Sequence, residues 1–173
     1  MGKFLIDINL KGKTSLITGA TKGLGRGAAI AIAEAGGNVI AVGRNQVELD
    51  SLSKIIRRLK VKYTSFNCDV NNYNQMKLFI GQLKKIDILV NNAGTNIPEA
   101  FLKVKKSSLN TLLNVNTKAV FNIAQLCANQ MIKLKNKQGS IINVSSIFGL
   151  VAGQKRTVYS MTKFGVEGLT KGM

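Results

Sequence analysis

Apolar residues occur along this chain in two different patterns. Five short runs have the length and composition of buried strands, and each is followed by glycine, asparagine, aspartate or serine. These runs cover residues 14–18, 38–42, 63–68, 86–90 and 140–144. Between them, apolar residues recur at the spacing of a helix that turns one face to a core. The pattern therefore predicts strands that alternate with helices.

A helix is predicted after each strand. An alanine-rich helix runs through residue 35, a polar-faced helix covers residues 46–59, and a third begins near residue 72. A long helix is expected at 107–133, and another begins at residue 158. Such alternation favours parallel strands joined by right-handed crossovers. We therefore expect an α/β fold with a doubly wound parallel sheet of the Rossmann type, which binds ligands at the carboxyl ends of its strands.

The length and hydropathy of the chain narrow its class. Its 173 residues suffice for one domain, and 45% hydrophobic content with a single proline excludes disorder. The apolar patch at residues 4–6 is cut short by Asp7, so it is too brief for a signal peptide. No uninterrupted apolar run is long enough to span a bilayer. We expect a cytoplasmic protein with no membrane segment.

The absence of histidine excludes several kinds of active site. A Ser-His-Asp triad, a Cys-His nucleophile and an imidazole metal site are all ruled out, and the few carboxylates show no paired ligand spacing. We expect no metal, and catalysis by tyrosine, lysine, serine or asparagine. Cys68 and Cys127 lie in a predicted strand and a predicted helix, which favours buried free thiols over a disulfide.

The formal charge of +17 raises the question of nucleic acid, because basic domains bind phosphate backbones. The basic residues are scattered over loops and helix ends, with the densest run at residues 57–62, and no series of aromatic residues accompanies them. This distribution favours solvated helix faces over a nucleic-acid surface. A general attraction for anionic cofactors and substrates follows in either case.

A glycine-rich turn separates the first predicted strand from the alanine-rich helix. It comprises Gly19, Ala20, Thr21, Lys22, Gly23, Leu24 and Gly25. In a strand–turn–helix unit, glycines let the backbone approach a pyrophosphate, and the helix N-terminus supplies free N–H groups. An ordinary tight turn is the alternative for this motif alone. We interpret residues 1–173 as a single dinucleotide-binding domain.

The second strand ends at Gly43-Arg44, where a carboxylate would bind the ribose 2′-hydroxyl of NAD(H). An arginine at this position accommodates the 2′-phosphate of NADP(H). Lys22 could add a second positive charge. We predict that NADP(H) is preferred over NAD(H); the alternative is that both cations face solvent in loops.

Tyr159, Lys163 and Ser146 are the candidate catalytic residues. Tyr159 and Lys163 are one helical turn apart and share a face, so the ammonium can favour the phenolate form of an otherwise weak acid. Ser146 would hold the oxygen that is protonated. Such a trio transfers a proton to a carbonyl or from an alcohol, and the hydride must come from a nicotinamide. A Tyr-x-x-x-Lys pair alone often occurs by chance. Its occurrence after the glycine-rich turn, the Asn-Asn-Ala-Gly turn and Ser146, in that order, is hard to obtain by chance.

Two further polar residues, Asp69 and Asn116, each have more than one interpretation. Asp69 lies with Val70 at the end of the third strand, either near an adenine or as the cap of the next helix. Asn116 lies in the middle of the long predicted helix, where it indicates a kink or a purposeful polar contact, with surface exposure as the alternative.

These motifs together resemble the short-chain dehydrogenase/reductase family over essentially the whole chain. The carrying motifs are residues 18–25, Asn91-Asn92-Ala93-Gly94, Asn116, Ser146 and Tyr159-x-x-x-Lys163.

The resemblance implies a role for each motif. Tyr159 would be the general acid/base, Ser146 would orient the substrate carbonyl, and Lys163 would assist Tyr159 and bind the nicotinamide ribose. Asn116 would hold a water in a proton relay. The cofactor-binding residues that the motifs and the resemblance predict are Gly19, Thr21, Lys22, Gly23, Leu24, Gly25, Arg44, Asp69, Val70, Asn92, Ala93, Gly94, Tyr159 and Lys163.

Within the family, residues 156–159 and 166–170 are most similar to bacterial 3-oxoacyl-acyl-carrier-protein reductases and to gluconate- or glucose-type dehydrogenases. That similarity implies a small-molecule or acyl-carrier-bound substrate, and a homodimer or homotetramer for the complete protein. The chain departs from the family at Met173, where about two further strands would be expected. The last strands are therefore expected to be missing, and we interpret the chain as a C-terminally truncated fragment; a truncated natural product is the alternative.

The sequence thus predicts an NADP-dependent oxidoreductase that acts on a carbonyl or secondary alcohol, either a 3-oxoacyl thioester or a sugar or polyol. A non-catalytic dinucleotide-binding or scaffold protein is the main alternative. A basic nucleic-acid-associated protein is a third, weaker interpretation.

Overall fold

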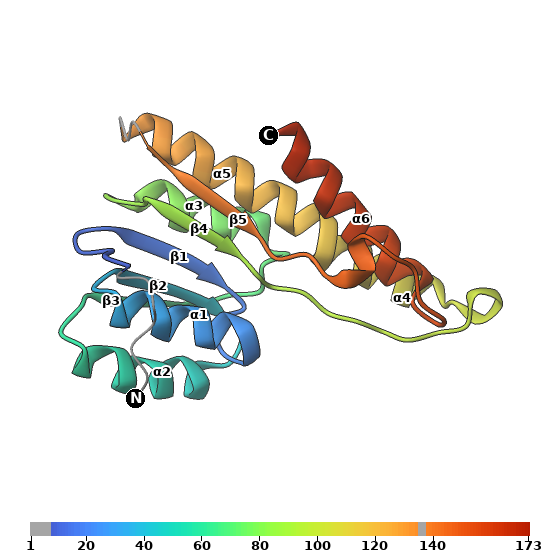
Figure 1. Cartoon of the computed structure of the whole chain (residues 1–173), viewed down its shortest axis with the longest axis horizontal. Helices are drawn as coiled ribbons and strands as arrows, with labels where there is room; N and C mark the ends of the chain where they lie inside the picture. The colour runs from blue at the N-terminus through green and yellow to red at the C-terminus, as the bar shows by residue number, and fades with distance from the viewer. Residues whose placement is uncertain (1–7, 135–137) are drawn as a thin grey trace.

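The computed structural model describes residues 8–134 and 138–173, and their strands form one parallel sheet (Figure 1). The sheet order is β3-β2-β1-β4-β5. Its strands are β1 (Thr14–Thr18), β2 (Asn38–Gly43), β3 (Tyr63–Asn67), β4 (Ile88–Asn91) and β5 (Ser140–Asn143). The order reverses direction between β1 and β4, which is the switch point where doubly wound sheets bind ligands. The predicted doubly wound parallel sheet is confirmed.

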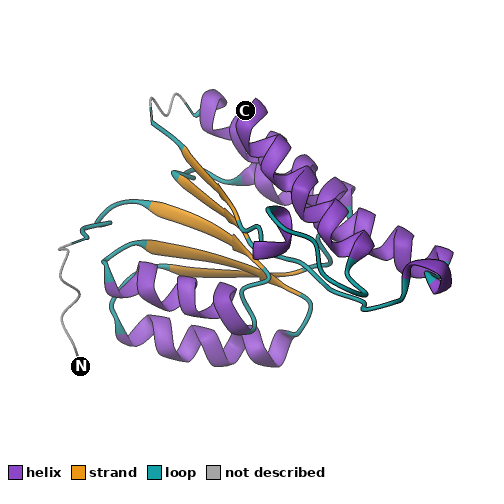
Figure 2. Ribbon diagram, turned by 45° about the vertical axis from the view of Figure 1, so that its right-hand side comes forward, coloured by secondary structure: helices purple, strands orange, loops and turns teal. Residues whose placement is uncertain are grey.

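Helices cover both faces of this sheet (Figure 2). They are α1 (Gly23–Glu34), α2 (Gln46–Arg58), α3 (Tyr73–Gln82), α4 (Lys106–Leu113), α5 (Ala119–Lys133) and α6 (Thr157–Gly172). Helices α1 and α2 pack on one face, and α3 and α5 pack on the other. Helix α6 packs against α4 and against residues 114–118. In the described residues, no helix combines the length and apolar composition needed to cross a membrane.

The core consists of two apolar clusters, one on each face of the sheet. Neighbouring residues of β1 point to opposite faces, so Leu16 joins the cluster under α3 and α5 and Ile17 joins the cluster under α1 and α2. Both side chains are fully buried. Burial of one such side chain stabilises the fold by roughly 1.5–3 kcal/mol. Burial on both faces explains why the central strands read as continuous apolar runs instead of alternating ones.

The expected long helix at 107–133 is interrupted. Residues Asn114–Lys118 form a π-helical segment between α4 and α5, labelled η2. Asn116 within it is fully buried, so the surface interpretation of that residue was wrong and the interpretation as a kink with a polar contact is confirmed. One extra residue per turn makes the helix bulge at this point, as π segments do near functional sites.

Two other expectations need correction. The fourth strand begins at Ile88, two residues later than expected, although Asp87 already donates its N–H to Thr14 and accepts from Ser140 at 3.0 Å. Helix α3 is capped by Asn72, whose side chain accepts from the N–H of Gln75 at 3.1 Å, so Asp69 does not cap it. An asparagine cap of this kind contributes about 1 kcal/mol.

Candidate active site

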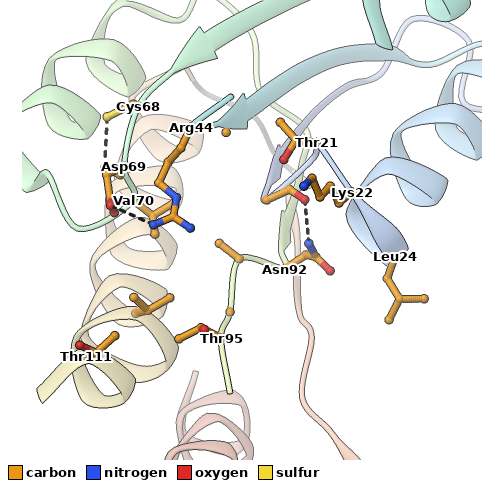
Figure 3. A pocket seen from close by; sticks show the side chains of 15 residues that line it. Thr21, Lys22, Leu24, Arg44, Cys68, Asp69, Val70, Asn92, Thr95 and Thr111 are labelled. Carbon is orange, nitrogen blue, oxygen red and sulfur yellow. Dashed lines mark hydrogen bonds and ion pairs between the residues drawn. The ribbon is translucent and has the colours of Figure 1, made fainter. Parts of the chain in front are cut away.

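A pocket of about 470 Å³ lies at the carboxyl ends of β1, β2, β3 and β4. Ten of the predicted cofactor-binding residues line it, together with five that the sequence had not indicated (Figure 3). The predicted ones are Gly19, Thr21, Lys22, Leu24, Arg44, Asp69, Val70, Asn92, Ala93 and Gly94; the additional ones are Gly43, Cys68, Thr95, Thr111 and Val115. Gly23, Gly25, Tyr159 and Lys163 do not line this pocket.

The glycine turn is held against the Asn-Asn-Ala-Gly turn by Thr18 and Asn92. The Thr18 hydroxyl accepts from the N–H groups of Asn92 and Ala93, each at 3.0 Å. The Asn92 side-chain amide donates back to the carbonyl oxygens of Thr18 at 3.0 Å and Gly19 at 3.3 Å. These bonds join the tips of two adjacent strands into one rigid rim of the pocket.

Close contact between these two turns also explains two of the glycines. Gly19 has φ of 65°, a conformation that side-chain-bearing residues rarely adopt. A Cβ on Gly25 would collide with the Gly19 carbonyl and with the Asn92 amide. Gly25 therefore shapes the pocket from behind, which accounts for its absence from the lining.

The start of α1 is suited to an anionic ligand. Its N-cap residue, Lys22, is extended and makes no side-chain capping bond, and the first turn carries no acidic residue. The first N–H groups of a helix have no partner within the helix, and the helix dipole places partial positive charge there. A phosphate bound at this end of the pocket would meet free donors and the Lys22 ammonium.

Arg44 and Asp69 face each other on the β2 and β3 side of the pocket. The Arg44 Nη1 lies 3.6 Å from the Asp69 Oδ2, and Figure 3 shows both side chains pointing toward the space between them. The Asp69 Oδ1 also accepts from the N–H of Asn71 at 2.9 Å, which fixes the carboxylate on its own loop.

Lys163 lies between this pocket and Tyr159. The lysine side chain is only 4% exposed, and its Nζ donates to the Val144 carbonyl at 2.8 Å. The same Nζ is 5.8 Å from the centre of the Tyr159 ring, and it lies 3.8 Å from where a Cβ on Gly94 would be. Burial lowers the pKa of the Lys163 ammonium below its ordinary value of 10.5.

Ser146 is brought to the N-terminal end of α6 by a short 3₁₀ helix, Ile147–Gly149 (η3). The Ser146 hydroxyl accepts from the N–H of Phe148 at 3.2 Å. The Phe148 ring packs edge-on against the Tyr159 ring, with 6.2 Å between centroids. Gly149 permits this packing, because a Cβ there would approach the Ser145 hydroxyl to 2.5 Å and the Lys163 carbonyl to 3.1 Å.

Asn116 connects the π segment to the loop that follows β4. Its Oδ1 accepts from the N–H of Thr95, and its Nδ2 donates to the Thr95 carbonyl, both at 2.9 Å. The Nδ2 also donates to the Thr162 hydroxyl at 3.2 Å, which ties in α6 one residue before Lys163. All four predicted catalytic residues therefore lie on segments that contact one another.

Sequence reasoning missed several residues that position this site. Phe148 and Gly149 set η3 against α6, and Asn91 anchors α5 by donating to the Val120 carbonyl at 2.7 Å. Asn91 was recognised as part of the Asn-Asn-Ala-Gly motif, but its role in anchoring α5 was not predicted. The ring contact of Phe148 has no signal in the local sequence, because it depends on the position of α6.

The fold and the pocket define a Rossmann-type α/β domain. Residues 13–173 match the short chain dehydrogenase family, and the chain belongs to that family. In the described residues, no group of three or more cysteine, aspartate or glutamate side chains is placed to hold a metal ion.

Named relatives in this family are oxidoreductases. The chain is 37% identical to a 3-oxoacyl-acyl-carrier-protein reductase of Thermotoga maritima, with 95% of this chain and 68% of the relative aligned. It is 33% identical to human L-xylulose reductase, with 97% and 67% aligned. The chain thus spans about two thirds of the length of these relatives.

Solved structures of dehydrogenases have the same fold as this chain. A short-chain dehydrogenase/reductase from Mycobacterium marinum superposes with a TM-score of 0.90 at 32% identity, covering 96% of this chain and 69% of that one. A putative 2-deoxy-D-gluconate 3-dehydrogenase from Agrobacterium tumefaciens, crystallised with NADP, has a TM-score of 0.87 at 29% identity, covering 95% and 65%.

Proposed function

We propose that this protein is an NADP(H)-dependent oxidoreductase that interconverts a carbonyl and a secondary alcohol. The observation that carries the proposal is the position of Lys163, which lies beside Gly94 of the dinucleotide pocket and beside the Tyr159 ring. A single buried cation thus connects the site that fits a cofactor with the group that fits a proton donor.

The pocket fits a dinucleotide in its donors and in its shape. Free N–H groups at the start of α1 and the Lys22 ammonium suit a pyrophosphate, and Gly19 and Gly25 allow the close approach of the backbone turns. Arg44, 78% exposed at the pocket edge, is available to a 2′-phosphate, which supports NADP(H) over NAD(H). When bound, the nicotinamide supplies or accepts the hydride at C4.

The chain's own residues supply the proton and hold the reacting oxygen. In the reducing direction, the Tyr159 hydroxyl donates its proton to the carbonyl oxygen, and in the oxidising direction the phenolate takes it back. The Lys163 ammonium stabilises the negative charge that develops on the tyrosine oxygen. The Ser146 hydroxyl donates a hydrogen bond to the same substrate oxygen. The Asn116 carboxamide, which is bonded to Thr95 and Thr162, holds the loop after β4 and helix α6 in place around it. Fixed geometry supplies much of the rate enhancement.

The substrate is proposed to be a 3-oxoacyl thioester or a sugar or polyol, in line with the names of the relatives. The protein is proposed to form a homodimer or homotetramer through α5 and α6. In support, Phe121, Met161 and Phe164 of these helices are nearly half exposed.

The test compares Tyr159→Phe with Tyr73→Phe, in which the replaced tyrosine lies on α3 and is 40% exposed. NADPH binding is measured by titration, and turnover is measured by NADPH absorbance with acetoacetyl thioesters and with xylulose. Tyr159→Phe should keep NADPH binding and lose nearly all turnover, while Tyr73→Phe keeps both. Ordinary turnover by Tyr159→Phe would reject the mechanism. NADPH binding without turnover by the unaltered chain would support the alternative of a non-catalytic dinucleotide-binding protein.

A further inference from the structure

Arg44 and Asp69 form an ion pair across one corner of the proposed cofactor pocket. Arg44 follows β2 and Asp69 follows β3, and these strands are paired in register up to Gly43 and Asn67. Parallel pairing therefore places the two charged residues side by side at the carboxyl edge of the sheet. Both line the pocket, with the Arg44 Nη1 at 3.6 Å from the Asp69 Oδ2.

The two partners are held very differently. The Asp69 carboxylate is fixed by the N–H of Asn71 at 2.9 Å, and the Asp69 carbonyl accepts from Asn72 at 2.9 Å. The Arg44 side chain is 78% exposed, and in the part of the chain that the structure describes its guanidinium makes no hydrogen bond. The separation of 3.6 Å is itself longer than a charge-assisted hydrogen bond. The anion is therefore fixed, and the cation is free to turn toward a stronger partner.

We propose that Asp69 lowers the selectivity of this site for NADP(H) over NAD(H) by competing with the 2′-phosphate for Arg44. The proposal rests on the proposed NADP(H) function. A phosphate needs the same guanidinium donors that face Asp69, and the fixed carboxylate also repels the phosphate charge. Asp69 is thus a positioning residue that acts through Arg44.

The size of the effect follows from the exposure of the pair. Exposed ion pairs are worth about 0.2–1 kcal/mol, which corresponds to a factor of roughly 1.4–5 in a binding constant. Asp69 also orients Arg44 over the pocket, and that effect has the opposite sign. We expect competition to dominate, because an exposed pair restrains Arg44 weakly whereas the carboxylate opposes the phosphate directly.

The experiment uses 2′,5′-ADP and 5′-AMP, which differ only in the 2′-phosphate and need no turnover. Their dissociation constants are measured by calorimetry at low salt for the unaltered chain, Asp69→Asn, Arg44→Gln and the double variant. Asp69→Asn keeps the acceptor for Asn71 and should raise the preference for 2′,5′-ADP over 5′-AMP by a factor of roughly 1.4–5, because any effect on adenine binding is common to both nucleotides. The gain should vanish in the Arg44→Gln background. Asp69→Ser provides a second replacement that keeps a side-chain acceptor.

Lys22→Gln is the matched control. Lys22 lines the same pocket and forms no ion pair with an acidic side chain in the described residues, so its loss should weaken 2′,5′-ADP equally with and without Asp69→Asn. An unchanged or reduced preference for 2′,5′-ADP in Asp69→Asn, or a gain that persists without Arg44, overturns the inference alone. Failure of the unaltered chain to bind either nucleotide overturns the proposed function as well.

Discussion

The Asn116 side chain and the Thr95 backbone are joined by two hydrogen bonds of 2.9 Å. The Asn116 carboxamide accepts from the Thr95 N–H and donates to the Thr95 carbonyl, as the backbone of a neighbouring strand would. Thr95 lies on the loop after β4, and Asn116 lies in the π segment between α4 and α5. The pair therefore holds one wall of the pocket against the helix that carries the distortion. Asn116 is fully buried, so its side chain depends on these protein partners instead of water.

Replacement of Asn116 by alanine should therefore be strongly destabilising. It removes both bonds to the half-buried Thr95 backbone and the bond to the buried Thr162 hydroxyl, and we expect a loss of about 1–3 kcal/mol in the free energy of unfolding. Asn114→Ala, at an exposed position of the same segment, should change it by less than about 0.5 kcal/mol. Urea denaturation measures both. Equal effects of the two replacements would show that the Thr95 bonds contribute nothing special.

Two glycines of α1 provide an internal comparison. In Gly25→Ala the new Cβ meets the Gly19 carbonyl and the Asn92 amide, and we expect a loss of about 2–3 kcal/mol together with weaker NADPH binding. In Gly27→Ala nothing lies within 4 Å, so the helix should gain about 0.5–1 kcal/mol. Thermal denaturation with and without NADPH distinguishes them. Stabilisation by Gly25→Ala would contradict the packing of the two turns.

The central strands β1, β2 and β4 were predictable because burial on both faces favours apolar residues, with a polar or glycine residue at the strand end, whereas the edge strands β3 and β5 are only partly buried. The expected starts at residues 14, 38, 63 and 140 are confirmed. The predicted start of the fourth strand at residue 86 was wrong. Ile86 is buried in the core, but it lies outside the backbone hydrogen-bond ladder of β4, which begins at Ile88. An apolar run in the sequence indicates which residues are buried. It does not indicate which of them form hydrogen bonds with a neighbouring strand.

The pocket was predictable from its motifs because its walls are local turns at strand ends. The π segment was not, because the distortion depends on partners distant in sequence, Thr95 and Thr162. Helix propensity alone identified Asn116 as unusual without deciding between a kink and exposure. The contact of Phe148 with Tyr159 depends in the same way on how α6 is placed.

Cys127 should make the protein sensitive to alkali. Burial raises the pKa of this thiol from 9.0 to about 12, so the folded state keeps a proton that the unfolded state releases. The resulting stabilisation is complete below pH 9, is on the order of 4 kcal/mol, and is lost as pH rises from 9 to about 12, with most of it gone by pH 11.

The measurement compares the unaltered chain with Cys127→Ala by urea denaturation from pH 7 to pH 11. Alanine lacks the titrating thiol, so the difference in unfolding free energy should shrink steadily above pH 9. Titrations of lysine and tyrosine are common to both proteins and cancel. A constant difference over this range would mean that the thiolate is tolerated in the fold.

Lys163 should have the opposite pH dependence. Burial lowers the pKa of its ammonium below 10.5, so between the folded pKa and 10.5 the unfolded state binds more protons than the folded state. The unfolding free energy should therefore rise with pH through that window. Lys163→Met removes the titrating group, and its lost bond to the Val144 carbonyl shifts the curve by an amount that does not depend on pH.

The quantity to measure is the unfolding free energy of the unaltered chain minus that of Lys163→Met, as a function of pH up to 10.5. It should increase with pH and then level off. Lys171→Met, at an exposed position of the same helix, serves as the control and should give a flat difference. A difference that falls with pH for Lys163→Met would mean that the folded state favours the charged ammonium, in which case its hydrogen bond to Val144 outweighs burial.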